Sequence, residues 1–148
     1  MSFTLPPELL EGSSLLGNEY GWKIAAFPDA IAKAEAAGYA CVGGQFQTRL
    51  DDGSVCQMYW LNADSRDRDD GELWSAYAHR SCSEVLSGFQ RLMAYTDFTK
   101  EVVGWRNELK AELAGGLDIM SVVVFVAYFI SEAEAAKLSV RHSEHLIK

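Results

Sequence analysis

The sequence predicts an α+β fold in which one layer of helices packs on one sheet. Two stretches flank Asp51-Asp52-Gly53-Ser54, and Asp-Gly favours a tight hairpin turn. Apolar residues recur at helical spacing through 73–93 and 98–113, and 119–130 is apolar on both alternating sets. The predicted order is β-α-β-β-α-α-β-α, a two-layer sandwich with an antiparallel or mixed sheet. The split βαβ (ferredoxin-like) arrangement is one form of it.

Composition sets the class of the protein before any motif is considered. The chain has 148 residues, 49% of them hydrophobic and 23% charged, which predicts a single domain over residues 1–148 and excludes a disordered chain. The net charge of −8 argues against nucleic acid and against an anionic membrane as partners, since both require clustered basic residues. Basic proteins remain as candidate partners.

The first third of the chain predicts two short helices and a strand. Pro7–Leu16 is expected to be helical, with Pro7 in the first turn. A strand is predicted over Tyr20–Ala25. Pro28 then suits the start of a helix that Gly38 ends.

The hairpin defines two faces if Asp52 and Gly53 form a two-residue turn. Leu50 then faces Val55, and Phe46 faces Tyr59. With Val42, Gly44 and Leu61 these residues would form the core face. The opposite face is mixed in character and would carry Gln45, Gln47, Arg49, Cys56, Met58 and Trp60.

The second half of the chain predicts two helices, a buried strand and a terminal helix. The first helix has apolar residues at Leu73, Tyr77, Val85, Phe89 and Met93, and the second at Phe98, Val102, Trp105, Leu109 and Leu113, before Gly115-Gly116. Ile119–Ile130 is predicted to be an interior strand covered on both faces. Ser131-Glu132-Ala133-Glu134 matches the capping box that begins a short helix.

Most of the net charge comes from one segment. Residues 51–72 hold seven acidic residues and two arginines, or −5 of the total of −8. A calcium loop that begins at Asp67 fails, because its fifth position is glycine and its twelfth is Ala78. Two interpretations remain. The segment is either a solvated turn that leads into a helix N-terminus, or a docking surface for a basic protein.

Several single residues admit a functional and an ordinary interpretation. Trp60 is either a core residue or the anchor of an interface. His79 and Cys82 are three apart on the long helix, but a nucleophile would also require an orienting group and an oxyanion pocket. His142 and His145 make too small a ligand set for zinc. The sequence therefore predicts no catalytic residue, no metal and no cofactor.

Cysteine usage and hydropathy predict the location of the protein. Cys41, Cys56 and Cys82 match neither a disulfide framework nor a zinc site, and we expect reduced, buried thiols in a cytoplasmic protein. The N-terminal residues lack the pattern of a secretory signal. The longest apolar run, Val122–Ile130, is too short to cross a bilayer.

Residues 17 to about 95 resemble the immunity protein 40 family of bacterial polymorphic toxin systems. The features that carry the resemblance are Trp22, Asp29-Ala30, Ala36–Gly38, Val42-Gly43-Gly44, Tyr59-Trp60, Asp70-Gly71-Glu72-Leu73-Trp74, Tyr77, Arg80 and Ser81. The chain has Gly43-Gly44-Gln45 where the family pattern has Gly-Gly-Asp, so one carboxylate is missing. The resemblance implies a cytoplasmic protein that binds and neutralises a cognate toxin domain, without catalysis or a cofactor.

These observations lead to three hypotheses. The first is an immunity protein that covers a basic toxin surface, with contacts from Asp52, Trp60, Asp64, Asp67, Asp69 and Asp70. The second is a small enzyme or ligand-binding domain with a pocket between sheet and helices, near His79 or Cys82. The third is a homo-oligomeric structural protein, such as a homodimer, in which a second copy shields one face of 119–130.

Overall fold

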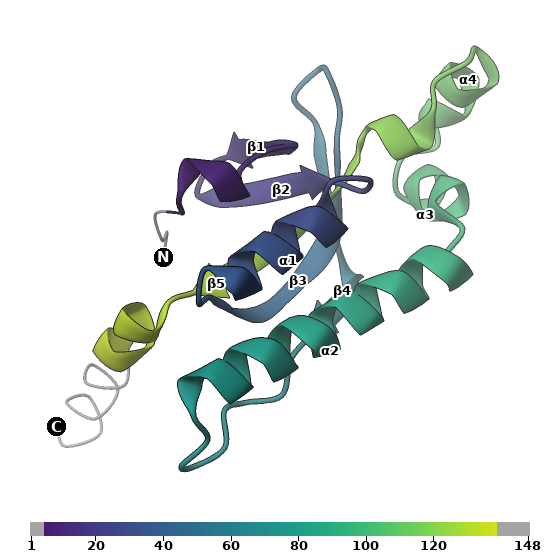
Figure 1. Ribbon diagram of the computed structural model, residues 1–148. Helices are drawn as coiled ribbons and strands as arrows, with labels where there is room; N and C mark the ends of the chain where they lie inside the picture. Colours follow the sequence, from purple (N-terminus) through teal and green to yellow (C-terminus); the bar gives the residue numbers. More distant parts are fainter. Residues whose placement is uncertain (1–4, 139–148) are drawn as a thin grey trace, which may run out of the picture.

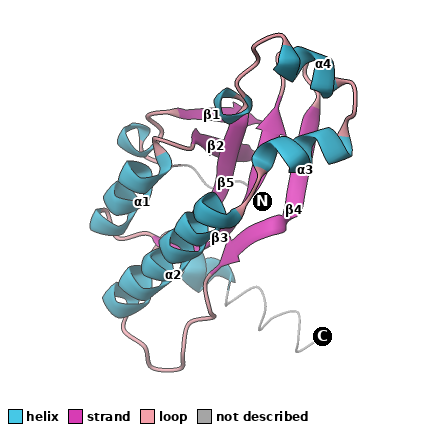
Figure 2. Cartoon of the chain, turned by 90° about the vertical axis from the view of Figure 1, so that its right-hand side faces the viewer, coloured by secondary structure: helices cyan, strands magenta, loops and turns pink. Residues whose placement is uncertain are grey.

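The computed structural model describes residues 5–138, which form one antiparallel sheet with helices packed on one face (Figures 1 and 2). The strand order is β1-β2-β5-β3-β4. The strands are β1 Ser13–Leu16, β2 Glu19–Lys23, β3 Ala40–Arg49, β4 Val55–Asp64 and β5 Val123–Ile130. This arrangement confirms the predicted α+β sandwich.

Two interleaved split βαβ units build the sheet. β2 and β3 both run antiparallel to β5, which lies between them, and helix α1 (Phe27–Ala36) connects the two. β4 and β5 likewise flank β3. Their connection contains α2 (Trp74–Tyr95), α3 (Phe98–Trp105) and α4 (Leu109–Ala114). The split βαβ arrangement expected from the sequence is therefore present. The strand order differs from the ferredoxin-like one, because β5 and β3, the fourth and second strands of the β2-α1-β3-β4-α2-β5 unit, lie at its centre in place of the first and third.

Aromatic rings fill the interface between sheet and helices. Phe27 of α1 packs on Phe125 of β5, with ring centroids 4.6 Å apart. Phe89 of α2 and Phe98 of α3 pack on Phe46 of β3, at 5.5 Å and 4.9 Å. All five rings are at most 5% exposed. This interface is a close-packed core.

The predicted helix over Pro7–Leu16 is wrong. A single 3-10 turn covers Pro7–Leu9, and the chain then turns at Gly12, whose φ is +75°, into β1. A second turn at Gly17, with φ +60°, returns the chain along β2. Pairing with β2 supplies the hydrogen bonds of these residues, and it overrides the local helical preference that Pro7 suggested.

The predicted two-residue turn of the β3–β4 hairpin is also wrong. The Leu50 amide donates to the Ser54 carbonyl oxygen over 2.9 Å, which leaves three residues in the turn. Gly53 has φ +88°, whereas Asp52 keeps a negative φ. A two-residue type I′ turn requires positive φ at both central residues. Asp52 instead accepts a hydrogen bond from the Ser54 amide through Oδ1, over 2.8 Å.

The change of register moves several residues of β4 to the other face of the sheet. Phe46 pairs with Met58 instead of Tyr59, so Met58 and Cys56 are buried in the core. A β-bulge in β4 then leaves Tyr59 and Trp60 exposed and returns the next residue, Leu61, to the core side. Val42 lies at a second bulge and is half-exposed rather than part of the core face. Gln45, Gln47 and Arg49 are predicted to lie on the face of the sheet that faces away from Phe46. Because side chains alternate along β3, this prediction does not depend on the turn, and it agrees with the register.

Two further predicted elements are interrupted. The helix expected through Leu113 is two helices, because the chain leaves helical geometry at Arg106, whose guanidinium donates to Ser54 of the hairpin over 2.8 Å. Ile119–Ser121 forms a 3-10 turn, so the strand begins at Val123. Leu73, predicted to lie on the apolar face of the long helix, is the exposed N-cap of α2.

The C-terminal predictions are confirmed. Ser131 and Glu134 form the reciprocal hydrogen bonds of a capping box, and residues 132–138 are helical. β5 is buried on both faces, and Tyr128 is its only exposed residue. Val124 and Val126, on the face away from the helices, are 7% and 0% exposed. The uncovered face of this strand, which led us to expect a second copy, is therefore absent.

Candidate partner-binding surface

The acidic loop, residues 64–72, connects the end of β4 to the N-cap of α2. It carries five acidic residues and two arginines. Figure 1 shows this loop and the tip of the β3–β4 hairpin at opposite ends of the molecule. The ten residues of β4 separate them, a distance of about 30 Å at the usual rise of a strand.

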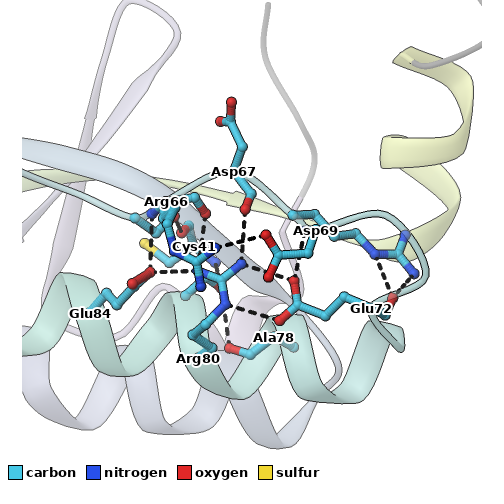
Figure 3. Close-up of polar contacts among 11 residues, drawn as sticks. Cys41, Arg66, Asp67, Asp69, Glu72, Ala78, Arg80 and Glu84 are labelled. Carbon is cyan, nitrogen blue, oxygen red and sulfur yellow. Dashed lines mark hydrogen bonds and ion pairs between the residues drawn. The ribbon is translucent and has the colours of Figure 1, made fainter.

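Arg80 of α2 holds the acidic loop in place (Figure 3). Its guanidinium makes two hydrogen bonds to the Glu72 carboxylate, both of 2.9 Å. It also donates to the main-chain oxygens of Arg66 and Asp67, over 3.2 Å and 3.0 Å. Glu84, one turn further along α2, accepts from Arg80 over 2.7 Å and from the Arg66 amide over 3.0 Å. One side chain therefore fastens both ends of the loop to the helix.

The Glu72 carboxylate is the second fixed point of the loop. It is 13% exposed, and it also accepts a hydrogen bond from the Asp69 amide over 2.9 Å. The hydrogen bonds from Arg80 and from that amide lower the pKa of Glu72 to about 2. Arg68 donates to the Glu72 carbonyl oxygen and lies over the Trp74 ring, 5.3 Å from its centroid. The ionised form of Glu72 is thus part of the folded loop.

Three carboxylates of the loop face solvent instead. Asp64, Asp67 and Asp70 are exposed, and their carboxylates make no hydrogen bond or ion pair with any residue in the described range 5–138. Figure 3 shows the Asp67 carboxylate turned away from the cluster, while its main-chain oxygen faces Arg80. Asp69 differs, because it accepts from Arg66 over 2.7 Å. The loop therefore presents a fixed main chain with three carboxylates that have no partner among the described residues.

The other two predicted contact residues lie elsewhere. Asp52 is at the hairpin tip, 3.3 Å from Arg106, and hydrogen bonds from Ser54 together with that guanidinium hold the pKa of Asp52 below its usual value. Trp60 lies in the β4 bulge, 55% exposed, and its indole donates to Glu101 of α3 over 3.0 Å. Trp60 is thus not a core residue. The structure brings together Asp64, Asp67, Asp69 and Asp70, but neither Asp52 nor Trp60.

The environment of Cys82 opposes its use as a nucleophile. Cys82 and His79 line a cavity of about 200 Å³ between α1 and α2. The His79 ring is 3.2 Å from the Glu35 carboxylate, whereas the Cys82 thiol is directed at the Tyr39 carbonyl oxygen. Burial, followed by the Glu35 charge, raises the pKa of the thiol to about 12. An activated cysteine requires the opposite shift.

The remaining sequence predictions concern metals, membranes and thiols. All three cysteines are free and buried. Within residues 5–138 no cluster of three His, Cys, Asp or Glu side chains is arranged to hold a metal, and no helix is long and apolar enough to span a bilayer. His142 and His145 lie outside the described residues.

Sequence reasoning found the acidic residues of the loop but did not predict that Arg80 and Glu84 hold the loop in place. Arg80 and Glu84 are four apart on α2, a spacing that predicts a pair on one helix face. The contact between Arg80 and Glu72 crosses a turn of the chain, and no periodic pattern signals it.

Comparison of the chain with protein-family models, with curated proteins and with solved structures finds no match. The resemblance to the immunity protein 40 family therefore stays a prediction from the sequence.

Proposed function

We propose that this protein is a non-catalytic immunity protein that binds a cognate bacterial toxin domain and neutralises it. The acidic loop is the contact surface, and the toxin supplies a basic surface. The observation that carries the proposal is the fixed main chain of the loop, on which Asp64, Asp67 and Asp70 have no side-chain partner among residues 5–138. Their charges are available to lysines and arginines of another protein.

The preorganised main chain of the loop supports the docking-surface interpretation over that of a solvated turn. A mobile loop loses conformational entropy when it docks, and this loss weakens the complex. The Arg80 contacts have already fixed the main chain at Arg66, Asp67 and Glu72. Arg80 also offsets the charge of Glu72, and it makes no hydrogen bond to the carboxylates of Asp64, Asp67 and Asp70. Complementary charge at such a surface raises the rate of association and excludes partners of like charge.

Protection of cells from the toxin domain encoded by the neighbouring gene tests the proposal. Co-expression of this protein should restore growth. The double variant Asp67→Lys/Asp70→Lys should lose most of the protection, because each substitution replaces an attractive charge with a repulsive one. Both residues are exposed, and their carboxylates have no partner in the part of the chain that the structure describes, so the variant should fold.

The matched control is Asp51→Lys/Glu112→Lys. It makes the same change of charge at two exposed residues outside the acidic loop, on the hairpin tip and on α4. Protection should survive in this variant. Growth arrest that this protein does not relieve would refute the immunity function, and equal protection by both double variants would refute the role of the acidic loop.

A further inference from the structure

The face of the sheet away from the helices is concave. Arg49 of β3 lies on this face, and its guanidinium donates to the Ser14 main-chain oxygen over 2.7 Å and to the Glu19 main-chain oxygen over 3.1 Å. In the sheet order β1-β2-β5-β3-β4, Ser14 is three strands away from Arg49. An arginine side chain spans that separation only if the sheet coils around it.

The concavity contains a cavity of about 540 Å³, a size typical of small-molecule sites. It lies on the opposite face of the sheet from the aromatic core. Side chains of β3, β4 and β5 and the turn between β1 and β2 form its wall. The lining residues are Leu16, Gly17, Asn18, Glu19, Gln47, Val55, Gln57 and Tyr128.

Gln47 presents a hydrogen-bond donor at this cavity. The residue is 1% exposed, and its Oε1 accepts from Arg49 Nε over 2.5 Å. Arginine offers only donors, so this contact fixes the amide with the oxygen toward Arg49. Nε2 of Gln47 makes no hydrogen bond with any residue from 5 to 138. Among the described residues only Thr48 Oγ1 is a fully buried side-chain polar atom without a partner. Nε2 of Gln47 therefore keeps access to the cavity, where a ligand oxygen can accept from it.

Gln57 repeats the arrangement on the neighbouring strand. It is the register partner of Gln47, so the two side chains lie next to each other on this face. Gln57 Oε1 accepts from the Tyr59 hydroxyl, and its Nε2 also lacks a partner among the described residues. The side-chain amides of two adjacent strands therefore line one cavity.

The charges around the cavity limit the ligand to at most one negative charge. Arg49 lies behind Gln47, and its charge polarises that amide and strengthens Nε2 as a donor. Glu19 is the one charged side chain in the lining, and it accepts from the Tyr128 hydroxyl. One positive charge behind the glutamines and one negative charge in the lining sum to zero, so they oppose a group with more than one negative charge. A dianionic phosphate would meet too little positive charge.

We propose that this cavity binds a carboxylate group, whose two oxygens accept from Nε2 of Gln47 and of Gln57. The carboxylate belongs either to a small organic acid or to the C-terminus of a polypeptide. The site shares no residue with the acidic loop, so it stands or falls independently of the immunity function.

A titration observed by NMR tests the site in the full chain. Sodium N-acetylglycinate should shift the side-chain NH₂ resonances of Gln47 and Gln57, and N-acetylglycinamide should bind at least tenfold more weakly. Equal affinity for the acid and the amide would overturn the proposal, since the two probes differ only in the carboxylate.

Gln47→Glu removes the donor and keeps both the size of the side chain and an acceptor for Arg49. It should lower the affinity for N-acetylglycinate at least tenfold, and Gln57→Glu, at a half-buried position, should do the same if the first variant does not fold. Gln45→Glu is the matched control, because Gln45 lies on the same face of β3 but does not line the cavity. Unchanged affinity in Gln47→Glu, or in Gln57→Glu where only that variant folds, would overturn the proposal.

N-acetyl-triglycine with a free or an amidated C-terminus distinguishes the two sources. Tighter binding of the free tripeptide than of N-acetylglycinate would assign the site to a polypeptide C-terminus. Equal affinity of these two acids, each above its amide, would assign it to a small organic acid.

Discussion

Arg80 and Glu72 give the acidic loop one conformation. Their two hydrogen bonds of 2.9 Å link the start of α2 to the loop that precedes it. The contact is largely shielded from water, with side-chain exposures of 20% and 13%. The geometry is that of a bidentate arginine–carboxylate pair, which is both stronger and more directional than a lysine contact.

The ionised form of Glu72 makes stability depend on pH. Its pKa is about 2 in the folded protein and near 4.5 in the unfolded chain, so the unfolded state binds more protons between these values. The contribution of Glu72 to the free energy of unfolding is therefore complete above about pH 4.5 and falls as the pH drops toward 2. Urea denaturation at several pH values should show this loss, and Glu72→Gln should reduce it. Identical pH profiles for the two proteins would contradict the assignment.

Gly44 allows β3 to approach a core ring. A Cβ at this position would lie 2.4 Å from the Phe125 ring and 2.5 Å from the Val126 carbonyl oxygen. Gly44→Ala should therefore lower the free energy of unfolding by about 1–3 kcal/mol, the range for an overpacked core.

The control for this variant is Gly104→Ala in α3, where a Cβ would meet no atom within 4 Å. It should leave stability unchanged or raise it by up to about 1 kcal/mol, because alanine favours the helix. Denaturant titration measures both variants, and equal stability of the two would refute the close approach at Gly44.

At the scale of elements, α2 and the acidic loop form one unit. The amide of Arg66 donates to Glu84, and the amide of Asp69 donates to Glu72. Both acceptors are held by Arg80. Loss of this arginine should release the loop without melting the helix, whose own hydrogen bonds are within the main chain.

Arg80→Gln should increase the hydrogen-exchange rates of the Arg66 and Asp69 amides. The amides in the middle of α2 should keep their protection. Arg91→Gln is the control, since Arg91 is an exposed arginine on the same helix. Loop amides that exchange at the wild-type rate in Arg80→Gln would show that Arg80 does not order the loop.

The elements that the sequence predicts correctly are those with local signals. Gly38, with φ +89°, follows the end of α1, and Ser131 with Glu134 begins the terminal helix. The hairpin register failed because it depends on the φ of Asp52 and on a bulge in β4, which no local pattern encodes. The sequence does not predict β1, because its four residues gain their strand hydrogen bonds only by pairing with β2. The acidic residues of the loop could be predicted from the sequence, whereas the register of the sheet and the contacts of Arg80 could not.

At the scale of the whole molecule, the structure divides the acidic segment of the sequence into two separate ends. Asp52 at the hairpin tip is paired with Arg106, whereas Asp64, Asp67 and Asp70 are unpaired within the described residues. The concave face of the sheet is a third region, lined by amides. Of the net charge of −8, residues 64–72 carry −3.

Charge at the loop should govern the rate at which the toxin domain associates. Asp67→Asn/Asp70→Asn should lower the association rate constant roughly tenfold at low salt and leave the dissociation rate nearly unchanged. Added salt should reduce the difference in association rate constant between the variant and the wild type. Stopped-flow kinetics at two ionic strengths measures this, and a change confined to dissociation would contradict electrostatic steering.

Hydrogen exchange of the complex with the toxin domain tests the central claim most directly. Binding through the acidic loop should protect the main-chain amides of residues 64–72 and the first turn of α2. The hairpin tip at 51–53 should exchange as it does in the free protein. Protection at the hairpin tip or on the concave face, with the acidic loop unchanged, would contradict the account.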